Sequence, residues 1–232
     1  MSLTLLDKSI ERVRLIDDDE DVRQGYAVHV EDMDIAIADE EGPIHDLSSL
    51  LAGMNITQDA VICDFNLKIK NYSSINGDEI VSGLYRSNIP AVLCTRNEPH
   101  LHEAIRRKRR YIPVVLSPKK MTQDTIIHAF KTCIEEFKGV FAPPRKPWRT
   151  MLRIEGGEST SDGLLKVNAV IPEWDPSTLL NFEWHIGDNE ALLLAKRSIE
   201  SGDILRLYAT VNVGADTQDD LFIEDWSLKR KA

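Results

Sequence analysis

Short apolar runs that end abruptly at polar side chains constrain the first half of this chain more than any other feature. The run Ala60–Cys63 ends at Asp64, and the apolar-rich segment 12–16 ends at Asp17 and Asp18. Strands that are hydrophobic at consecutive positions are typical of sheets with both faces covered. Segments with helical spacing lie between the runs, so the chain is predicted to form a parallel sheet between two layers of helices.

Strand and helix signals alternate over residues 10–139. The predicted strands are residues 12–16, 35–38, 60–64, 89–94 and 111–116. The predicted helices are residues 21–30, 46–53, 78–85, 98–107 and 122–139. Five strand–helix units of this kind predict an α/β domain with a flavodoxin-like, doubly wound (βα)5 parallel sheet.

Polar side chains stand at the carboxyl ends of four predicted strands. They comprise carboxylates, a hydroxyl and an ammonium, namely Asp17, Asp18, Asp64, Thr95 and, just past the fifth strand, Lys119. Ligands of doubly wound sheets bind at this edge, and Mg²⁺ prefers carboxylate oxygens. We therefore expect a metal-assisted, phosphate-handling site. The simpler alternative for the acidic run is a solvated turn that opens a helix, where carboxylates favour the helix dipole.

These spaced positions resemble the receiver (REC) domain of two-component response regulators over about residues 12–139. The resemblance implies that Asp17 and Asp18 bind Mg²⁺ and that Asp64 is the phospho-acceptor. It further implies that the backbone carbonyl of Asn66 is a metal ligand. In such a site Mg²⁺ would offset the repulsion between the acceptor carboxylate and the phosphoryl oxygens.

The resemblance also implies that Thr95 donates a hydrogen bond to the phosphoryl group and that Lys119 supplies a second positive charge. Two alignments remain open: either Lys119 is the family's lysine, or Ser117–Pro118 occupies the lysine–proline slot and the ammonium is missing. The loop 64–77 is longer than the family's usual connection and lacks its Met-Pro pair, and Leu116 replaces the usual aromatic switch residue. We expect the phosphorylation chemistry to be intact, whereas the coupling to an output is an open question.

Charge and composition exclude some classes of function. The net charge is −10, whereas nucleic-acid backbones are held mainly by Lys and Arg, so DNA binding is not expected. The three cysteines lack metal-ligand spacing and lie in apolar surroundings, which is typical of a reducing cytoplasm. The N-terminal residues do not have the pattern of a signal peptide, and no apolar stretch reaches transmembrane length. We expect a cytoplasmic protein with no membrane association.

The second half changes character after residues 140–150, a proline-rich, basic segment that is predicted to be a semi-rigid linker. Short strands separated by glycine-containing turns are predicted in the rest, at residues 151–155, 164–171, 180–186, 191–195, 204–213 and 221–226. Residues 190–198 also fit a short helix. This spacing predicts a small, mainly antiparallel β domain over residues 151–232, either a sandwich or a barrel, with no resemblance to a known family.

Other candidate features have plain structural interpretations. Residues 151–232 hold 15 acidic and 8 basic residues and no recognisable catalytic motif, which argues against nucleic-acid binding there. His185 is expected to be a sheet residue, and the four tryptophans are expected to be core or interface side chains. The basic run Arg106–Arg110 is either a solvated face or a contact for an acidic partner, within the chain or across a homodimer.

The leading interpretation is a response-regulator-like phosphorelay signalling protein. Asp64 would accept a phosphoryl group from a histidine kinase or a phosphotransfer protein, and the β-rich domain would relay the switch to a downstream protein partner. No enzymatic activity is expected beyond phosphorylation and dephosphorylation of the receiver itself. Two alternatives remain: a pseudo-receiver that serves as a phosphorylation-independent interaction or dimerisation module, and a receiver-regulated enzyme with an activity in residues 151–232.

Overall fold

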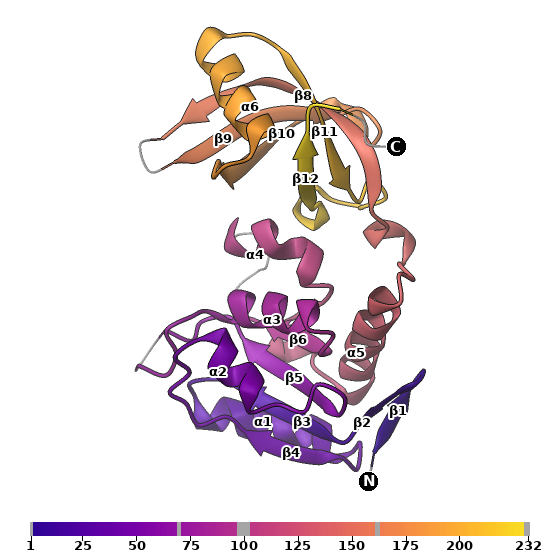
Figure 1. Ribbon diagram of the computed structural model, residues 1–232. Helices are drawn as coiled ribbons and strands as arrows, with labels where there is room; N and C mark the ends of the chain where they lie inside the picture. The colour runs from indigo at the N-terminus through magenta and orange to yellow at the C-terminus, as the bar shows by residue number, and fades with distance from the viewer. Residues whose placement is uncertain (1, 69–70, 97–102, 161–162, 230–232) are drawn as a thin grey trace. The chain divides into compact units, whose positions relative to one another are not determined.

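The computed structural model describes residues 2–68, 71–96, 103–160 and 163–229 (Figure 1). The chain divides into two compact units, Met1–Phe141 and Ala142–Ala232. Each unit has its own apolar core.

The first unit is built on a five-stranded parallel sheet with the order β4-β3-β5-β6-β7. Its strands are β3 (Arg12–Ile16), β4 (Ala36–Asp39), β5 (Asp59–Asp64), β6 (Ala91–Cys94) and β7 (Val115–Leu116). Numbered by their succession along the chain, these strands lie in the order 2-1-3-4-5, which is that of flavodoxin-like doubly wound folds. The predicted (βα)5 architecture is confirmed.

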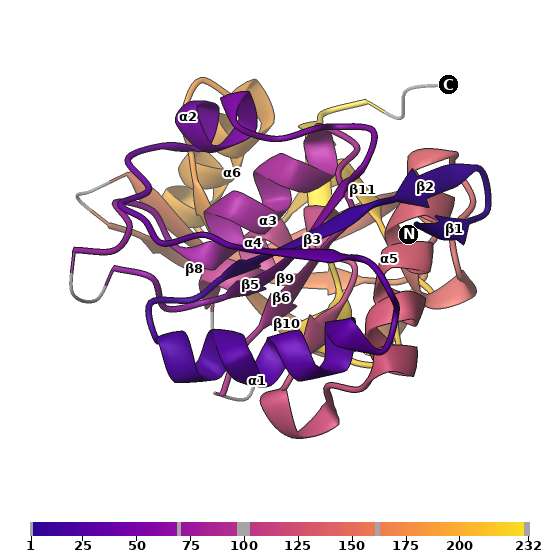
Figure 2. The ribbon, with the colours of Figure 1, turned by 90° about the horizontal axis from the view of Figure 1, so that it is seen from below.

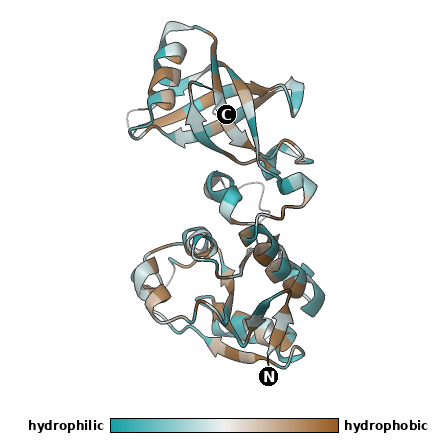
Figure 3. Cartoon of the chain, turned by 45° about the vertical axis from the view of Figure 1, so that its right-hand side comes forward, coloured by the Kyte–Doolittle hydropathy of each residue, from teal (hydrophilic) through white to brown (hydrophobic). Residues whose placement is uncertain are grey.

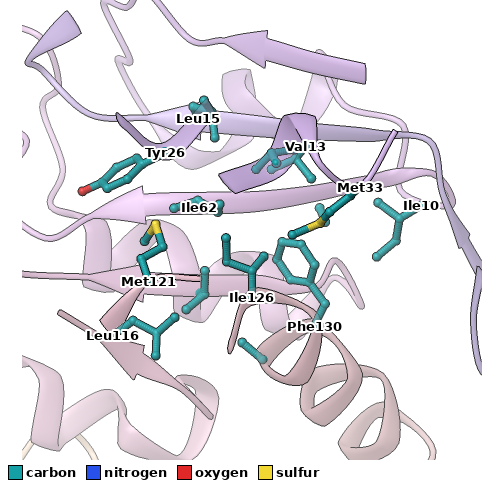
Figure 4. Close-up of a cluster of buried hydrophobic side chains, with 14 of the residues drawn as sticks. Ile10, Val13, Leu15, Tyr26, Met33, Ile62, Leu116, Met121, Ile126 and Phe130 are labelled. Carbon is teal, nitrogen blue, oxygen red and sulfur yellow. The ribbon is translucent and has the colours of Figure 1, made fainter. Parts of the chain in front are cut away.

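Helices cover both faces of this sheet, and α1 lies on the opposite side from α2 and α3 (Figure 2). The helices are α1 (Glu20–Glu31), α2 (Leu47–Ala52), α3 (Gly77–Arg86), α4 (Glu103–Lys108) and α5 (Gln123–Phe137). Alternate residues of a strand serve the two faces: Ile62 of β5 packs with α1 and α5 (Figure 4), whereas Val61 packs with α3. Because both faces are buried, the strands are apolar at consecutive positions, which is the pattern that predicted this sheet.

Two parts of the first unit differ from the prediction. β7 has only two residues, because residues 109–111 form a 3-10 turn and Pro113 has no N–H to donate to a neighbouring strand. The chain also begins with an antiparallel hairpin that was not predicted, β1 (Leu3–Leu5) and β2 (Lys8–Ile10). Strands of three residues are too short to give a periodic signal. Apolar side chains of the hairpin pack against the core cluster that α5 also covers.

Asp59 brings a buried charge to the amino end of β5. Arg12 donates to it through Nε and Nη2, both at 2.9 Å, and Arg14 Nε donates at 3.0 Å. Arg14 Nη1 also reaches Glu40 at 3.1 Å. Burial by itself would raise the pKa of Asp59, but the hydrogen bonds from Arg12 and from the Asn55 amide outweigh it and hold that pKa below its usual value. Asp59 is therefore an ionised anchor between β3 and β5.

The long loop between β5 and α3 is anchored on the loop that follows β4. A parallel bridge joins Ile44 to Ser73, and the Tyr72 hydroxyl donates to the Glu40 carbonyl. Gly42 has a φ of +72°, and a Cβ there would lie 2.9 Å from the Tyr72 ring, so glycine permits both the turn and the close approach. The described part of this loop is thus packed against its neighbour at the carboxyl edge of the sheet.

The second unit is a five-stranded antiparallel sheet with one helix. Its strands lie in the order β10-β9-β8-β11-β12. They are β8 (Trp148–Ser159), β9 (Leu164–Ile171), β10 (Asp175–His185), β11 (Leu205–Val211) and β12 (Ile223–Ser227), with α6 (Glu190–Ser201) between the third and fourth. The prediction of a small antiparallel β domain is confirmed.

This sheet curls into a partly open barrel. Leu152 and Ile154 of β8 face its apolar interior, and hydropathy alternates along the strands (Figure 3). The two edge strands meet through Trp184 of β10 and Trp226 of β12, whose ring centroids are 4.5 Å apart. A single five-stranded sheet whose edge strands approach each other fits the predicted barrel better than a sandwich, which needs two stacked sheets.

The prediction of a strand at residues 191–195 was wrong, and the alternative of a helix was right. Asn189 caps the start of α6 by accepting from the amides of Ala191 and Leu192, and Gly202 ends it in a left-handed conformation at φ +76°. Ala191, Leu192 and Ala195 lie on the buried face, which is helical spacing. A short apolar run alone does not distinguish a strand from a helix, whereas the caps do.

The segment predicted as a linker is partly held by the second unit. Residues Pro143–Arg145 form a 3-10 turn, and β8 begins at Trp148. The fully buried Asn212 donates from Nδ2 to the Pro144 carbonyl at 2.9 Å and accepts from the Phe222 amide at 2.7 Å. Trp148 is 49% exposed, whereas the other three tryptophans pack against the barrel interior.

Candidate functional site

The carboxyl edge of the parallel sheet brings the predicted acidic residues together. The register pairs Ile16 with Cys63 and Asp64 with Cys94, so Asp17, directly after β3, lies level with Asp64, the last residue of β5. β3 and β5 are neighbours in the sheet. The two carboxylates are close enough that the charge of Asp17 raises the pKa of Asp64. The site therefore begins as a pair of acids on adjacent strand ends.

Asp17 is almost fully buried and is held by three groups. Its Oδ1 accepts from the Asp19 amide at 2.9 Å, and its Oδ2 accepts from the Tyr26 hydroxyl at 3.2 Å. The Arg23 guanidinium donates to its backbone carbonyl. Burial raises the pKa of Asp17 despite the Asp19 and Tyr26 hydrogen bonds, and the charges of Asp18 and Asp19 raise it further.

Asp64 is half-buried, and burial together with the charge of Asp17 raises its pKa to about 6. The Asn66 amide donates to Asp64 Oδ2 at 2.8 Å, which partly opposes this rise. A carboxylate with this pKa is mostly ionised at neutral pH. Asp64 is thus an anion without an ion-pair partner among the described residues, and a cation at this edge would lower its energy.

The donor set suits Mg²⁺ but not an all-protein metal cage. Among the described residues, no three His, Cys, Asp or Glu side chains are grouped so that they would hold a metal ion. Mg²⁺ is commonly bound through one or two carboxylates, with waters and substrate phosphates as its remaining ligands. The half-buried Asp18 and the exposed Asn66 flank the Asp17–Asp64 pair. Asp19 instead caps α1, since it accepts from the Asp21 amide at 3.0 Å.

Thr95 and the residues after β7 occupy the other side of the edge. Thr95 is buried, and its amide donates to the Leu116 carbonyl at 3.0 Å. Because Cys94 pairs with Leu116, the residue directly after β7 and level with Thr95 is Ser117. Lys119 lies two residues further, in the 3-10 turn Pro118–Lys120, where its side chain is exposed. The role of Lys119 at the site stays a prediction.

Sequence reasoning missed two residues that shape this edge. Tyr26 was expected only as a member of the predicted helix 21–30, yet its hydroxyl donates to Asp17. Gly77 was expected only as the end of the loop 64–77, yet a Cβ there would lie 1.8 Å from the Asp64 carbonyl oxygen. Its amide donates to the Phe65 carbonyl at 2.9 Å. No local signal specifies either contact, because each joins residues of two different elements, nine and thirteen positions apart.

Part of the basic run Arg106–Arg110 is engaged within the first unit. Lys108 Nζ lies 2.5 Å from the buried Asp78, the second residue of α3. Arg110 donates to the Tyr85 hydroxyl at 2.9 Å, and that hydroxyl donates to the buried Glu136 of α5 at 2.9 Å. These two basic residues therefore link α4 and the following turn to α3 and α5 rather than forming only a solvated face.

The second unit has an open pocket of about 680 Å³ between the start of α6 and the end of β12. It is lined by Asp188, Asn189, Glu190, Ala191, Trp226, Ser227, Leu228 and Lys229. The Asn189 side chain already satisfies two amides at the helix start. The lining presents exposed acids next to a lysine and an aromatic ring.

No protein-family model matches the chain, and no curated protein matches it. Solved structures that are similar include a response regulator receiver domain protein from Clostridium thermocellum, with 16% identity, a TM-score of 0.42, and coverage of 57% of this chain and 100% of that chain. A response regulator receiver protein from Pseudoalteromonas atlantica has 13% identity, a TM-score of 0.39, and coverage of 54% and 98%. A de novo designed Rossmann 2x3 protein has 13% identity, a TM-score of 0.34, and coverage of 57% and 94%.

The first unit has the fold of receiver domains. Its strand order shows this fold, and similarity at such identities extends no further than the fold. A designed protein lies in the same range of similarity as the natural receivers. The chemistry of the edge has to be argued from its own residues.

Proposed function

We propose that the first unit is the receiver of a response-regulator-like signalling protein and that Asp64 is its phospho-acceptor. The observation that carries the proposal is the Asp17–Asp64 pair: two carboxylates at the same level on adjacent strand ends, with the pKa of Asp64 raised to about 6. Two carboxylates on neighbouring strand ends repel each other unless a cation binds between them or one of them is protonated. Such a pair is unfavourable in a purely structural role.

The proposed reaction is a phosphoryl transfer to Asp64. The ionised carboxylate attacks phosphorus, a P–O bond forms, and the N–P bond of a phosphohistidine donor breaks. The departing imidazole nitrogen keeps the bonding electron pair and takes up a proton. Asp17 and Asp64 would hold Mg²⁺, which when bound supplies positive charge against the phosphoryl oxygens. Direct ligation by Asp18 and by the Asn66 carbonyl stays a prediction. Thr95 and Lys119 would contact the transferred group from the β6 and β7 side of the edge.

The test is phosphorylation of the full-length chain with acetyl phosphate and Mg²⁺, followed by intact-mass spectrometry. One phosphoryl group is expected on the wild type and none on Asp64→Asn. Asp21→Asn removes an exposed acid of the same cluster and is expected to leave the modification unchanged. The proposal fails if the wild type gains no phosphoryl group, or if Asp64→Asn gains it equally.

One observation favours a second candidate, a pseudo-receiver that acts without phosphorylation. Ser117 directly follows β7, whereas Lys119 is exposed two residues later. If Lys119 contacts the phosphoryl group, Lys119→Ala slows phosphorylation and Lys120→Ala does not. If the ammonium is missing instead, Lys119→Ala has no effect, and Ser117→Lys raises the rate by placing a cation beside Thr95.

The second unit is proposed to carry the output by binding a protein partner. Its partly open barrel offers strand edges and loops rather than a catalytic constellation. The phosphoryl donor is proposed to be a histidine kinase or a phosphotransfer protein, and the setting to be the cytoplasm. Within the described part of the chain, no helix combines the length and the apolarity that a membrane span requires.

A further inference from the structure

Tyr26 places a hydroxyl at the acidic edge from inside the apolar core. It lies in the second turn of α1 and is 3% exposed. Figure 4 shows its ring beside Leu15 and Ile62 with the hydroxyl directed away from the apolar side chains. That hydroxyl donates to Asp17 Oδ2 at 3.2 Å. A phenol with its ring fixed by packing has little freedom to move this donor.

The Tyr26 bond completes a set of contacts that fixes the Asp17 carboxylate. The Asp19 amide donates to the other oxygen at 2.9 Å, and the Arg23 guanidinium donates to the Asp17 backbone carbonyl. An ionised carboxylate has about four lone-pair sites, so one donor on each oxygen leaves further sites available. The sites that remain are those through which Asp17 can bind a cation beside Asp64.

We propose that Tyr26 is a positioning residue, which holds the Asp17 carboxylate in the orientation that binds Mg²⁺ next to Asp64. This inference rests on the proposed function of the edge. Groups that hydrogen-bond a metal ligand fix its orientation, and their removal typically weakens metal affinity about 10- to 100-fold. Without the hydroxyl, one oxygen of a buried carboxylate loses its donor, and only the Asp19 amide still fixes the orientation of the carboxylate.

The experiment measures Mg²⁺ affinity of the full-length chain by following backbone amide NMR shifts during a titration with Mg²⁺ alone. Tyr26→Phe keeps the ring and removes only the hydroxyl, and we expect its Mg²⁺ affinity to fall about tenfold. Tyr85→Phe is the matched control, because Tyr85 is also buried but its hydroxyl donates to Glu136. It should bind Mg²⁺ as the wild type does.

A second comparison separates positioning from general loosening of the fold. In an Asp17→Asn background, where the carboxylate is gone, Tyr26→Phe should cause no further loss of Mg²⁺ affinity. Equal affinity of wild type and Tyr26→Phe overturns the inference and leaves the proposed function standing. Equal losses in Tyr26→Phe and Tyr85→Phe, or a further loss in the Asp17→Asn background, also overturn it. Absence of Mg²⁺ binding by the wild type overturns both the inference and the metal-assisted function.

Discussion

Gly77 occupies the tightest point between α3 and the end of β5, and its replacement tests the geometry of the site. In Gly77→Ala, the new Cβ would lie 1.8 Å from the Asp64 carbonyl oxygen and 2.8 Å from its carbonyl carbon. Ordinary contact begins near 3.4 Å, so the helix start and the strand end would have to separate by more than an ångström. Both partners are backbone, and neither can rotate away as a side chain would.

The expected cost follows from this overlap. Overpacking a core typically costs about 1–3 kcal/mol, and a clash between two backbone segments lies at the upper end, about 3 kcal/mol. Gly25→Ala supplies the matched control, because nothing lies within 4 Å of a Cβ built at Gly25 in the middle of α1. That substitution should stabilise the protein by about 0.5–1 kcal/mol, since alanine is the better helix former.

Chemical denaturation followed by far-UV circular dichroism measures both free energies of unfolding. Hydrogen exchange followed by mass spectrometry shows which segments are destabilised. In Gly77→Ala, the exchange rate should increase most in peptides from β5 and α3. All four tryptophans lie at residue 148 or beyond, so their fluorescence reports the second unit separately. A Gly77→Ala variant as stable as the wild type, or a Gly25→Ala variant destabilised to the same extent, would contradict the predicted backbone clash at Gly77.

Two further predictions concern charged groups of the first unit. Because burial raises the pKa of Asp64 to about 6 from 3.8, its contribution to stability is complete below about pH 4 and is lost as the pH rises through about 6. Asp64→Asn should therefore be about 1–2 kcal/mol more stable than the wild type at pH 7.5, after allowance for partial exposure, and equal to it near pH 4, in denaturation measured across this range. Asp59→Asn should lower the free energy of unfolding by about 3 kcal/mol, because Arg12 and Arg14 lose their buried carboxylate. Glu40→Gln, at the rim of the same network, should lower it by less than about 1 kcal/mol. Equal losses of stability in the two variants would contradict the conclusion that Asp59 is the buried charge of this network.

Much of the first unit was predictable because its signals are local. The segment 60–64 is apolar at consecutive positions and ends in a carboxylate, and this reflects a strand covered on both faces. Asp17, Asp64 and Thr95 could be assigned to one edge because parallel strands bring their carboxyl ends together. The two-residue β7 gives no such signal, so only its pairing with β6 places Ser117, rather than Lys119, directly after the strand.

In the second unit, local sequence patterns were not sufficient to specify the structure. The run 191–195 fits a strand or a helix by its apolar content, and the caps at Asn189 and Gly202 decide for the helix. A sandwich and a barrel share the same alternating strands, and only the structure shows that Trp184 and Trp226 bring the two edge strands of one sheet together. Such contacts join residues 42 positions apart in the sequence, and neither residue's neighbours specify its partner.

The sequence by itself determined which residues end the buried strands, and hence that a cluster of carboxylates meets at one edge of a parallel sheet. Hydrophobic periodicity is sufficient for that result, because it locates the strand ends and parallel strands bring their carboxyl ends to one edge. Only the tertiary structure decided how those carboxylates are held. The Tyr26 hydroxyl reaches Asp17 and the Gly77 backbone touches Asp64 because α1 and α3 pack on opposite faces of the same sheet, and such contacts depend on side-chain direction and backbone spacing that no local pattern records.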